Sequence, residues 1–393
     1  NRNGGFIGTD GLDAPDPPTA VTPTAGDQQL SIAFTAPTDT GTSAITGFVA
    51  QVASSGDNYS AGSNTGSSSP IVISSLSNGT SYTAKVWAIN AYGTSAPSEA
   101  SSGVSPALQR GLFGGGYAPN SNVIQYVNIA SAGNATDFGD LTVTRWALAS
   151  FSSSTRGVWA GGADPNDTNV IDYVTIASTG NATDFGDIDR TNTSYIAGCS
   201  NSTRGLIAGG NDRNNIDYVT IASTGNTTDF GNMTQNTYGL SAAASSTRAV
   251  FYETNNGGNG SNVISYVTIG STGNASDFGD MAENISFAAA CSSATRALKG
   301  AGFDGSSRNN TINYITIAST GNETNFGNLT VIRQTLASTS SATTGLWAGG
   351  NDNVTNVIDQ VTMASTGNAT DFGDLLSTQR LLAGCSSDHG GLQ

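Results

Sequence analysis

The sequence predicts an all-β protein with two parts, a β-sandwich followed by a longer array of repeated sheets. Three observations predict it. A string close to "IASTGNATDFGD" (residues 176–187) occurs six times in the later part of the chain. Runs of β-branched and aromatic residues are short and are bounded by Gly, Ser and Asn. Finally, 37% of the residues are hydrophobic, which is too many for a disordered low-complexity chain even though 50 of the 393 residues are Gly.

The repeats follow one another at a nearly constant spacing. In the second repeat, residues 145–152, 158–162, 170–178 and 183–188 read as four strands, from inner to outer. A β-rich period in the high forties is typical of one four-stranded propeller blade. We therefore expect residues 109–393 to form a six-bladed β-propeller. The aromatic residues of successive repeats lie 45 to 48 residues apart, at Phe138, Phe185, Phe230, Phe278, Phe326 and Phe372.

The two ends of the array predict how it closes. It begins at "RGLFGGG" (residues 110–116), which matches the second strand of a repeat, and its last strand-like segment is "RLLAGCSS" (residues 380–387), which matches a first strand. If this last strand completes the first blade, no sheet edge is left open. We expect this closure, and an open array or stack is the alternative.

The residue order within the repeats resembles the kelch repeat. A double glycine, a Tyr, an aromatic residue and an Arg follow one another, as in Gly161-Gly162, Tyr173, Phe185 and Arg190. The aromatic residue is Phe where kelch blades usually have Trp. The fourth repeat departs most, because "VFYETNN" (residues 250–256) stands where the double glycine is expected. The resemblance implies a kelch-like β-propeller.

The segment before the array, residues 13–108, predicts a separate domain. Residues 30–37, 45–52 and 83–93 read as alternating strands between Gly/Ser/Asn turns. The run from Leu76 to Tyr82 resembles the tyrosine corner of a fibronectin type III domain, in which Phe34 takes the place of the usual core Trp. This resemblance implies a fibronectin type III β-sandwich. Residues 1–12 are expected to be a linker or a tether to an upstream part.

Charge, hydropathy and cysteine content argue against nucleic-acid binding, membrane binding and a disulfide framework. The net charge is −15, with 29 acidic residues against 14 Lys and Arg, which argues against binding to nucleic acid or to anionic lipid. No run reaches the length of a membrane span, so we expect no membrane insertion. The odd cysteine count and the absence of a CxxC element predict buried thiols rather than a disulfide framework, at Cys199, Cys291 and Cys385.

One catalytic signal in the sequence is not expected to be real. Asp184-Phe185-Gly186 matches the magnesium-binding triplet of protein kinases, but a kinase also needs a Gly-rich loop, a strand lysine and helices. An equivalent triplet recurs once per repeat, with Asn in place of Asp in the fifth, which indicates that Phe packs between blades while Gly and Asp or Asn shape a turn. The single histidine, His389, argues against a copper or zinc centre and against a Ser-His-Asp triad.

No catalytic residue, cofactor or metal ligand is therefore predicted, and the protein is expected not to be an enzyme. A carboxylate-pair glycosidase is the enzyme class left open, because acidic residues are plentiful. Arginines that follow "ST" in the repeats, or "AT" in the case of Arg296, are expected to be structural, at Arg156, Arg204, Arg248 and Arg296. Sequons at one repeat position are expected to serve the turn before the Phe rather than to carry glycans, at Asn134, Asn181, Asn226, Asn274, Asn322 and Asn368.

The loops after the double glycines differ in length and sequence among the repeats. A constant scaffold that presents variable loops is how repeat proteins diversify binding. The Asp- and Asn-rich loops at 164–169 and 351–356 also offer oxygen ligands for calcium, but none has EF-hand-like spacing, and turn formation is the favoured explanation. The candidate ligand-facing residues are Tyr117, Asn120, Asp164, Asn166, Asp167, Asn211, Asp212, Arg213, Asn255, Asn256, Asp304, Arg308, Asn351 and Asp352.

Three stretches together resemble virion proteins of marine cyanobacterial phages: "GGFIGTDGLDAPDPPTAV" (4–21), "SAITGFVAQ" (43–51) and "VIDYVTIASTGNATDFGD" (170–187). The resemblance implies a non-enzymatic tail-fibre or appendage protein on the virion surface, outside the cell. Its expected partners are other virion proteins and a host-surface glycan or protein. The alternatives are a structural subunit of an extracellular filament or capsid decoration, a bacterial surface protein with a borrowed array, and a secreted carbohydrate-active enzyme.

Overall fold

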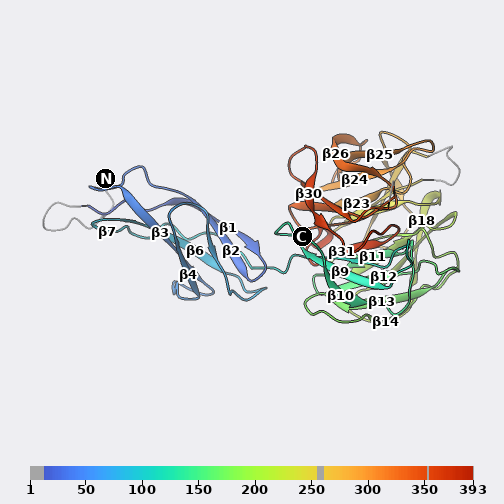
Figure 1. Cartoon of the computed structure of the whole chain (residues 1–393), viewed down its shortest axis with the longest axis horizontal. Coiled ribbons are helices and arrows are strands. Elements are labelled where there is room, and N and C mark those ends of the chain that lie inside the picture. The colour runs from blue at the N-terminus through green and yellow to red at the C-terminus, as the bar shows by residue number, and fades with distance from the viewer. Residues whose placement is uncertain (1–12, 255–260, 352–353, 393) are drawn as a thin grey trace. The chain divides into compact units, whose positions relative to one another are not determined.

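The structure is a computed structural model that describes residues 13–254, 261–351 and 354–392. The chain divides into two compact units between Leu108 and Gln109 (Figure 1). Both units consist of β-strands and turns, and the described part has one short 3-10 helix, η1 (Gly390–Leu392). The segment expected to be a linker, residues 1–12, lies outside the described residues. Each unit is described by itself below.

The N-terminal unit consists of two antiparallel sheets with strand orders β1-β2-β5 and β4-β3-β6-β7. The inner faces of the two sheets bury a shared apolar core that includes Phe34 and Phe48, whose rings lie 4.8 Å apart. Tyr82 is buried, and its hydroxyl accepts a hydrogen bond from the Ser77 amide at 3.1 Å. The predicted tyrosine corner is therefore present. The strands are β1 (Thr19–Gly26), β2 (Gln29–Thr35), β3 (Ile45–Ala53), β4 (Gly62–Gly66), β5 (Ile71–Ile73), β6 (Thr83–Asn90) and β7 (Gly93–Thr94).

The last segment of this unit lies alongside β6 and is hydrogen-bonded to it at every third residue. Ser95, Ser98 and Ser101 each donate their amide to a β6 carbonyl, at 2.8, 3.0 and 3.0 Å. Each of the three hydroxyls also accepts a β6 amide, at 2.9, 3.0 and 2.9 Å. The serine hydroxyls thus satisfy backbone donors that a regular neighbouring strand would otherwise pair.

The C-terminal unit consists of six four-stranded antiparallel sheets, named here sheets I to VI. We number the positions within a sheet from first to fourth in the order of strand pairing. The strands in that order are, for sheet I, β31 (Ala383–Ser386), β8 (Arg110–Gly114), β9 (Val123–Asn128) and β10 (Thr136–Asp140); for sheet II, β11 (Ala149–Ser152), β12 (Arg156–Ala160), β13 (Val170–Thr175) and β14 (Thr183–Asp187); and for sheet III, β15 (Ala197–Ser200), β16 (Arg204–Ala208), β17 (Arg213–Thr220) and β18 (Thr228–Thr237).

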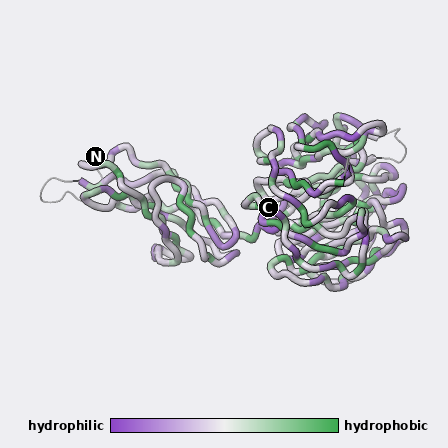
Figure 2. Tube along the Cα trace, in the orientation of Figure 1, coloured by the Kyte–Doolittle hydropathy of each residue, from purple (hydrophilic) through white to green (hydrophobic). Residues whose placement is uncertain are grey.

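Sheets IV to VI repeat this order. Sheet IV has β19 (Ser241–Ala244), β20 (Arg248–Tyr252), β21 (Val263–Thr268) and β22 (Ser276–Asp280); sheet V has β23 (Ala289–Ser292), β24 (Arg296–Phe303), β25 (Arg308–Thr316) and β26 (Thr324–Arg333); and sheet VI has β27 (Ala337–Ser340), β28 (Thr344–Ala348), β29 (Val357–Thr362) and β30 (Thr370–Asp374). Hydrophobic residues occur in every sheet rather than in one segment (Figure 2).

The sequence explains why the strands of this unit are buried on both faces. In β12 the four residues after Arg156 are all buried, and every residue of β11 is buried. Such strands carry small or apolar residues at successive positions because each sheet face packs against a neighbour. The first strand is shorter than expected from residues 145–152, because Ala147 adopts a φ of 54° and interrupts the extended backbone before Ala149.

The first-position strands contact one another in an unbroken cycle. β11 contacts β15, β15 contacts β19, β19 contacts β23, β23 contacts β27, β27 contacts β31, and β31 contacts β11. β31 also pairs with β8, with Ala383 opposite Gly114 and Ser386 opposite Gly111. The C-terminal strand thus completes the sheet that contains the first strand of the array.

The repeated string makes the same contact between neighbouring sheets each time. Between sheets I and II, the Gly180 amide donates to the Phe138 carbonyl at 2.7 Å, and the Asp140 amide donates to Oδ1 of Asn181 at 3.1 Å. The equivalent pair between sheets VI and I joins Gly133 to Phe372 at 2.8 Å. The six sequon asparagines all accept such an amide through Oδ1, from residues 374, 140, 187, 232, 280 and 328.

The arginines that follow "ST" are also structural, as expected. Arg156 lies over the ring of Tyr173 at 4.6 Å and donates to the carbonyl of Ile221, in the next sheet, at 2.9 Å. Arg204 repeats this arrangement over Tyr218 and donates to Ile269. Each cation therefore links the third strand of its own sheet to the neighbouring sheet through a charge-assisted hydrogen bond.

Candidate functional site

The first-position strands surround a narrow cavity to which all six sheets contribute. Because side chains alternate along a strand, Ser150 and Ser152 of β11 line the cavity, and Phe151 between them packs among hydrophobic residues of sheets II and III. The residues of the other five sheets that line the cavity are small as well: glycines, alanines, serines, a threonine and cysteines. The cavity has two ends, and they differ in chemistry.

At one end, serine hydroxyls link neighbouring sheets. Ser152 donates to the carbonyl of Ser386 at 2.6 Å, and Ser200 donates to the carbonyl of Ser152 at 2.7 Å. Ala244 stands at the equivalent position of sheet IV, where no such hydroxyl is available. The other members of this serine ring are Ser292, Ser340 and Ser386, which donate to the carbonyls of residues 244, 292 and 340.

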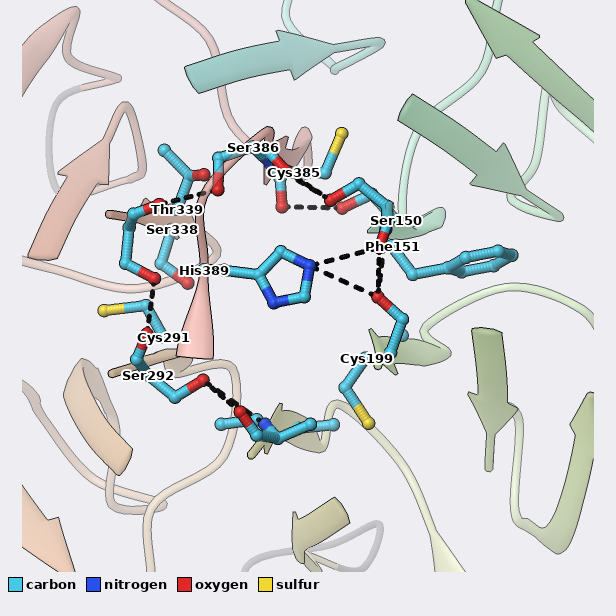
Figure 3. A pocket seen from close by; sticks show the side chains of 18 of the residues that line it. Ser150, Phe151, Cys199, Cys291, Ser292, Ser338, Thr339, Cys385, Ser386 and His389 are labelled. Carbon is cyan, nitrogen blue, oxygen red and sulfur yellow. Dashed lines mark hydrogen bonds between the residues drawn. The ribbon is translucent and has the colours of Figure 1, made fainter. Parts of the chain in front are cut away.

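The C-terminal tail covers this end of the cavity. In Figure 3 the imidazole of His389 lies within a circle of side chains from the first-position strands. Its Nε2 lies 3.1 Å from the Ser152 carbonyl, and its Nδ1 accepts the Gly391 amide at 3.1 Å. Nδ1 is therefore unprotonated, and the proton is on Nε2. A Cβ on Gly391 would lie 1.8 Å from the Ser200 carbonyl oxygen, so only glycine fits there.

Burial sets the protonation of the groups at this end. It lowers the pKa of His389 to about 4, so the ring is neutral at ordinary pH. Cys199, Cys291 and Cys385 are free and buried, and burial raises the pKa of the Cys199 thiol to about 12. Their sulfur atoms point away from the imidazole, out of the circle (Figure 3). The expectation of buried thiols is confirmed, and protonated thiols of this kind are poor nucleophiles.

At the other end, six residues that precede the first strands are joined by five backbone hydrogen bonds, which run from Gly239 round to Tyr195, and are named here the mouth ring. The Tyr195 amide donates to the Ala147 carbonyl at 2.8 Å, and the Phe287 amide donates to the Gly239 carbonyl at 2.8 Å. All six have φ between 54° and 70°, although five of them are not glycine. Left-handed backbone at non-glycine residues costs free energy and is often found at functional sites. The mouth ring is Ala147, Tyr195, Gly239, Phe287, Thr335 and Leu381.

An unbroken chain of aromatic side chains, named here the aromatic arc, lies beside the mouth ring. It consists of Tyr117, Trp146, Tyr195, Tyr238 and Phe287. The ring centroids of successive members are 5.6, 5.7, 4.6 and 5.6 Å apart. Tyr117 is 37% exposed and the other four are half-buried. The arc therefore offers an accessible aromatic surface along sheets I to V.

Polar groups border the aromatic arc. The Arg380 guanidinium lies 4.8 Å from the centroid of Tyr117. Burial and a hydrogen bond with Tyr238 raise the pKa of Tyr195 well above its ordinary range, so its hydroxyl remains protonated. A protonated hydroxyl can both donate and accept a hydrogen bond.

The structure brings several of the predicted loop residues together beside the arc. Asn120 donates through Nδ2 to Oδ1 of Asp164 at 2.6 Å, which joins the loops of sheets I and II. Asn211 donates to Oδ2 of Asp167 at 3.2 Å, which joins the loops of sheets II and III. Because Trp146 pairs with Ala163 at the base of the second loop, these loops and the arc are at the same end of the sheets.

The remaining candidates are dispersed. Asn166 is exposed in the sheet II loop, Asp212 is exposed, and Arg213 begins strand β17 opposite Thr237. Asp304 is tied within its own loop, because the amides of residues 306 and 307 both donate to its Oδ1 at 2.7 Å. These bonds hold the pKa of the Asp304 carboxyl below its usual range.

Two further candidates lie in sheets V and VI, and three lie outside the described residues. Arg308 pairs opposite Phe303, and Asn351 pairs with Gln334. Asn255, Asn256 and Asp352 belong to the part of the chain that the structure does not describe.

Sequence reasoning missed four of the five aromatic residues, because it searched only the loops after the double glycines. Trp146, Tyr195, Tyr238 and Phe287 instead lie in the segments that lead into the first strands. Aligning the six repeats on their first strands would have shown an aromatic residue within one position of the same place in sheets II to V. Only Tyr117 was named, as part of a loop.

The site can bind through aromatic surface and hydrogen bonds. Within residues 13–254, 261–351 and 354–392, no three His, Cys, Asp or Glu side chains come together as a group able to hold a metal ion. Over the same residues, no helix has the length and hydropathy of a membrane span.

Comparison with known proteins identifies the family of one part of the chain. Residues 13–104 match the model of the fibronectin type III domain. The N-terminal unit contains a fibronectin type III domain. The match begins at the first described residue and ends at Val104, which pairs with Tyr82 at the tyrosine corner. A search of curated proteins found none that matches the chain.

Proposed function

We propose that the C-terminal unit is a six-bladed, kelch-like β-propeller that binds a cell-surface glycan at the end bearing the aromatic arc. In this proposal the protein is a non-enzymatic attachment protein on the surface of a phage virion. The aromatic arc is the observation that carries the binding proposal.

The propeller proposal is supported by the order of the sheets. Six sheets of four antiparallel strands follow one another, their first strands contact in a cycle, and the last strand pairs into the first sheet. Pairing of the first and last strands of the array within one sheet is how propellers avoid an open edge. The sheets are the blades in this reading, and the cavity bounded by β11, β15, β19, β23, β27 and β31 is the central channel.

The glycan proposal is supported by the chemistry of the arc and of its border. Sugar rings present C–H faces that pack on aromatic side chains, and their hydroxyls need donors and acceptors at the edges. Trp146 and Tyr195 supply such faces with centroids 5.7 Å apart. Asp164, Asp167 and Asn211 supply polar groups in neighbouring loops. The net charge of −15 favours a neutral or cationic glycan over a strongly anionic one.

The virion setting is supported by the sequence resemblance to phage appendage proteins and by the domain organisation. A fibronectin type III domain joined to a propeller separates a mounting module from a binding module. The chain enters sheet I at the start of β8, and the loop that contains Tyr117 follows the end of that strand. The binding end of the sheets is thus the end away from the connection.

Glycan-array binding of the full chain tests the proposal, with bacterial lipopolysaccharides and polysaccharides as the probes. We expect Trp146→Ala and Tyr195→Ala to weaken binding at least about tenfold, as truncation of central aromatic anchors does. Tyr92→Ala is the matched control, because Tyr92 is 50% exposed in the other unit. Calorimetric unfolding confirms that each variant is folded.

Three outcomes would overturn this proposal. Binding that the arc variants leave unchanged would place the site elsewhere. Absence of binding together with ordered polymerisation would favour a structural subunit of an extracellular filament or capsid surface. Release of sugar from any probe would favour a secreted carbohydrate-active enzyme.

A further inference from the structure

Sheet V differs from the other five sheets at three positions that meet in space. Lys299 stands in the second strand where the other sheets have an aromatic residue or Ile. Asn313 lies directly opposite it in β25. Glu323 stands in the turn before β26, where the other repeats have Ala or Thr. Because the three differing residues contact one another, we treat them as one cluster rather than as three separate substitutions.

The three side chains share one carboxylate oxygen. Lys299 Nζ lies 3.0 Å from Oε2 of Glu323, and Asn313 Nδ2 lies 3.2 Å from the same oxygen. The amide of Ala282 also donates to it, at 3.1 Å. Side chains of directly opposed residues in an antiparallel pair lie on the same face with Cβ atoms about 5 Å apart. The lysine amine and the asparagine amide are therefore neighbours across β24 and β25.

The cluster is closed to solvent. The side chains of Lys299 and Glu323 are 2% and 0% exposed. Tyr252 of sheet IV covers the amine, with its ring centroid 5.5 Å from Nζ. Among the described residues, Oε1 of Glu323 and the Tyr252 hydroxyl have no hydrogen-bond partner. A buried ion pair with an unpaired carboxylate oxygen is costly, and proton transfer from the amine to the carboxylate removes both charges.

Burial lowers the pKa of Lys299, which favours the neutral amine. The neutral form is nucleophilic, because its lone pair is free, and the proton that it gives up to the carboxylate is then available for donation. A carboxyl group at Glu323 lies within hydrogen-bond distance of both reacting side chains. This arrangement has the parts of a general acid–base reaction between an amine and an amide.

We propose that Lys299 and Asn313 form an intramolecular isopeptide bond with Glu323 as the catalytic residue. Nζ of Lys299 attacks Cγ of Asn313, the C–Nδ2 bond breaks, and one ammonia leaves. Rotation of the amide by half a turn places Oδ1 against the protonated Glu323, which donates its proton as the carbonyl is attacked. The carboxylate then takes a proton from Nζ and passes it to the leaving nitrogen. As ammonia leaves, the carboxylate takes back the proton from the hydroxyl formed at Oδ1, which restores the carbonyl of the new amide. Atoms and charge balance without any oxidant or co-reactant.

The bond ties two neighbouring strands of one sheet together. It joins the middle of β24 to the middle of β25, on the face that packs against sheet IV. A cross-link that closes the loop between them restricts the unfolded chain. Such a bond resists mechanical and thermal separation of β24 from β25, which suits a protein exposed outside the cell. This inference is independent of whether the aromatic arc binds a glycan.

Intact mass spectrometry and peptide mapping of the full chain test the proposal. We expect a mass lower than that of the sequence by one ammonia. Trypsin cannot cleave after an acylated lysine, so the map should contain residues 297–308, uncut at Lys299, joined to residues 309–333. Lys299→Met, Asn313→Ala and Glu323→Gln should each restore the full mass predicted for that variant.

The controls separate this reaction from other losses of ammonia. Succinimide formation at Asn78-Gly79 also releases ammonia, but it joins no two peptides and is unaffected by Lys299→Met. Lys85→Met changes the other lysine of the chain and should leave the ammonia loss in place. The proposal is overturned if folded wild-type protein has its full mass and trypsin cleaves after Lys299. Because this result needs no variant, it stands even if a substitution prevents folding.

Discussion

At the scale of single residues, the repeated string specifies the seams between sheets. The Asn of each apparent sequon accepts an amide of the neighbouring sheet, and the Phe carbonyl accepts another. The Gly of each apparent kinase triplet allows this close approach. Gly186 has a φ of 146°, and a Cβ there would lie 2.5 Å from the Gly225 carbonyl oxygen. The string occurs six times because the same contact is made at each of the six boundaries between neighbouring sheets.

A matched pair of glycine variants tests this explanation. Gly186→Ala adds a methyl group against the Gly225 carbonyl, whereas Gly180 has a similar φ of 153° and nothing within 4 Å of its Cβ position. Both variants carry the backbone strain, and only Gly186→Ala carries the clash. We expect Gly186→Ala to cost about 1–3 kcal/mol more than Gly180→Ala, as overpacking does. Urea denaturation of the two variants measures the difference.

Equal costs for the two variants would contradict the close approach and leave only backbone strain. The comparison is internal, because the same substitution is made twice in one repeat. It therefore does not depend on the stability of the fibronectin type III domain.

Several residue roles were predictable from the sequence, and others were not. The packing of Phe185, the buried cysteines and the structural role of Arg156 follow from residue type and repetition. The aromatic arc and the cluster around Lys299 do not. The arc forms because residues about fifty positions apart meet between sheets, and the Lys299 cluster forms because β24 and β25 pair in a register that places Lys299 opposite Asn313.

At the scale of elements, the strands were largely predictable and the C-terminal tail was not. Turn glycines and β-branched runs gave the four strands of each sheet, but the first strand begins only after the left-handed residue of the mouth ring. The tail carries too little hydrophobic pattern to predict where it lies. Its position depends on two glycines that fit against carbonyls and on one imidazole.

The tail should respond to acid through His389. Its folded pKa is lowered to about 4 from 6.5, so between these values the unfolded chain binds more protons than the folded one. Docking of the tail is therefore complete above pH 6.5 and weakens as the pH falls toward 4. A proton on Nδ1 would also oppose the Gly391 amide, which Nδ1 now accepts. The weakening is at most about 3 kcal/mol by linkage, and partial solvent contact reduces it.

Proton NMR measures this directly, because the chain has one histidine. We expect the imidazole signals to titrate with a midpoint near 4 in the full chain. His389→Gln should make cleavage of the tail by a protease independent of pH between these limits. A midpoint at the ordinary value of about 6.5 would show that the imidazole is solvated rather than docked.

At the scale of the whole molecule, the two units have separate hydrophobic cores and are expected to unfold separately. The fibronectin type III domain has its own sandwich core. The C-terminal unit instead divides its core among neighbouring sheets, so that each sheet is stabilised by the two beside it. Sequence periodicity predicted the number of sheets. The contact of β31 with both β27 and β11 is a property of the whole chain.

This contact predicts that β31 controls the stability of all six sheets. Truncation after Ser377 removes β31, which leaves β8 an unpaired edge and exposes β27 and β11. We expect calorimetry to show the loss or broadening of the unfolding transition of the C-terminal unit, with the transition of the fibronectin type III domain unchanged. Truncation after Asp388 is the control, because it removes only the tail and should retain both transitions. A synthetic peptide of residues 378–393 should restore the lost transition, since it supplies the missing strand. If the chain without β31 unfolds as the intact chain does, the sheets are stabilised by their other neighbours alone and the contacts of β31 contribute nothing.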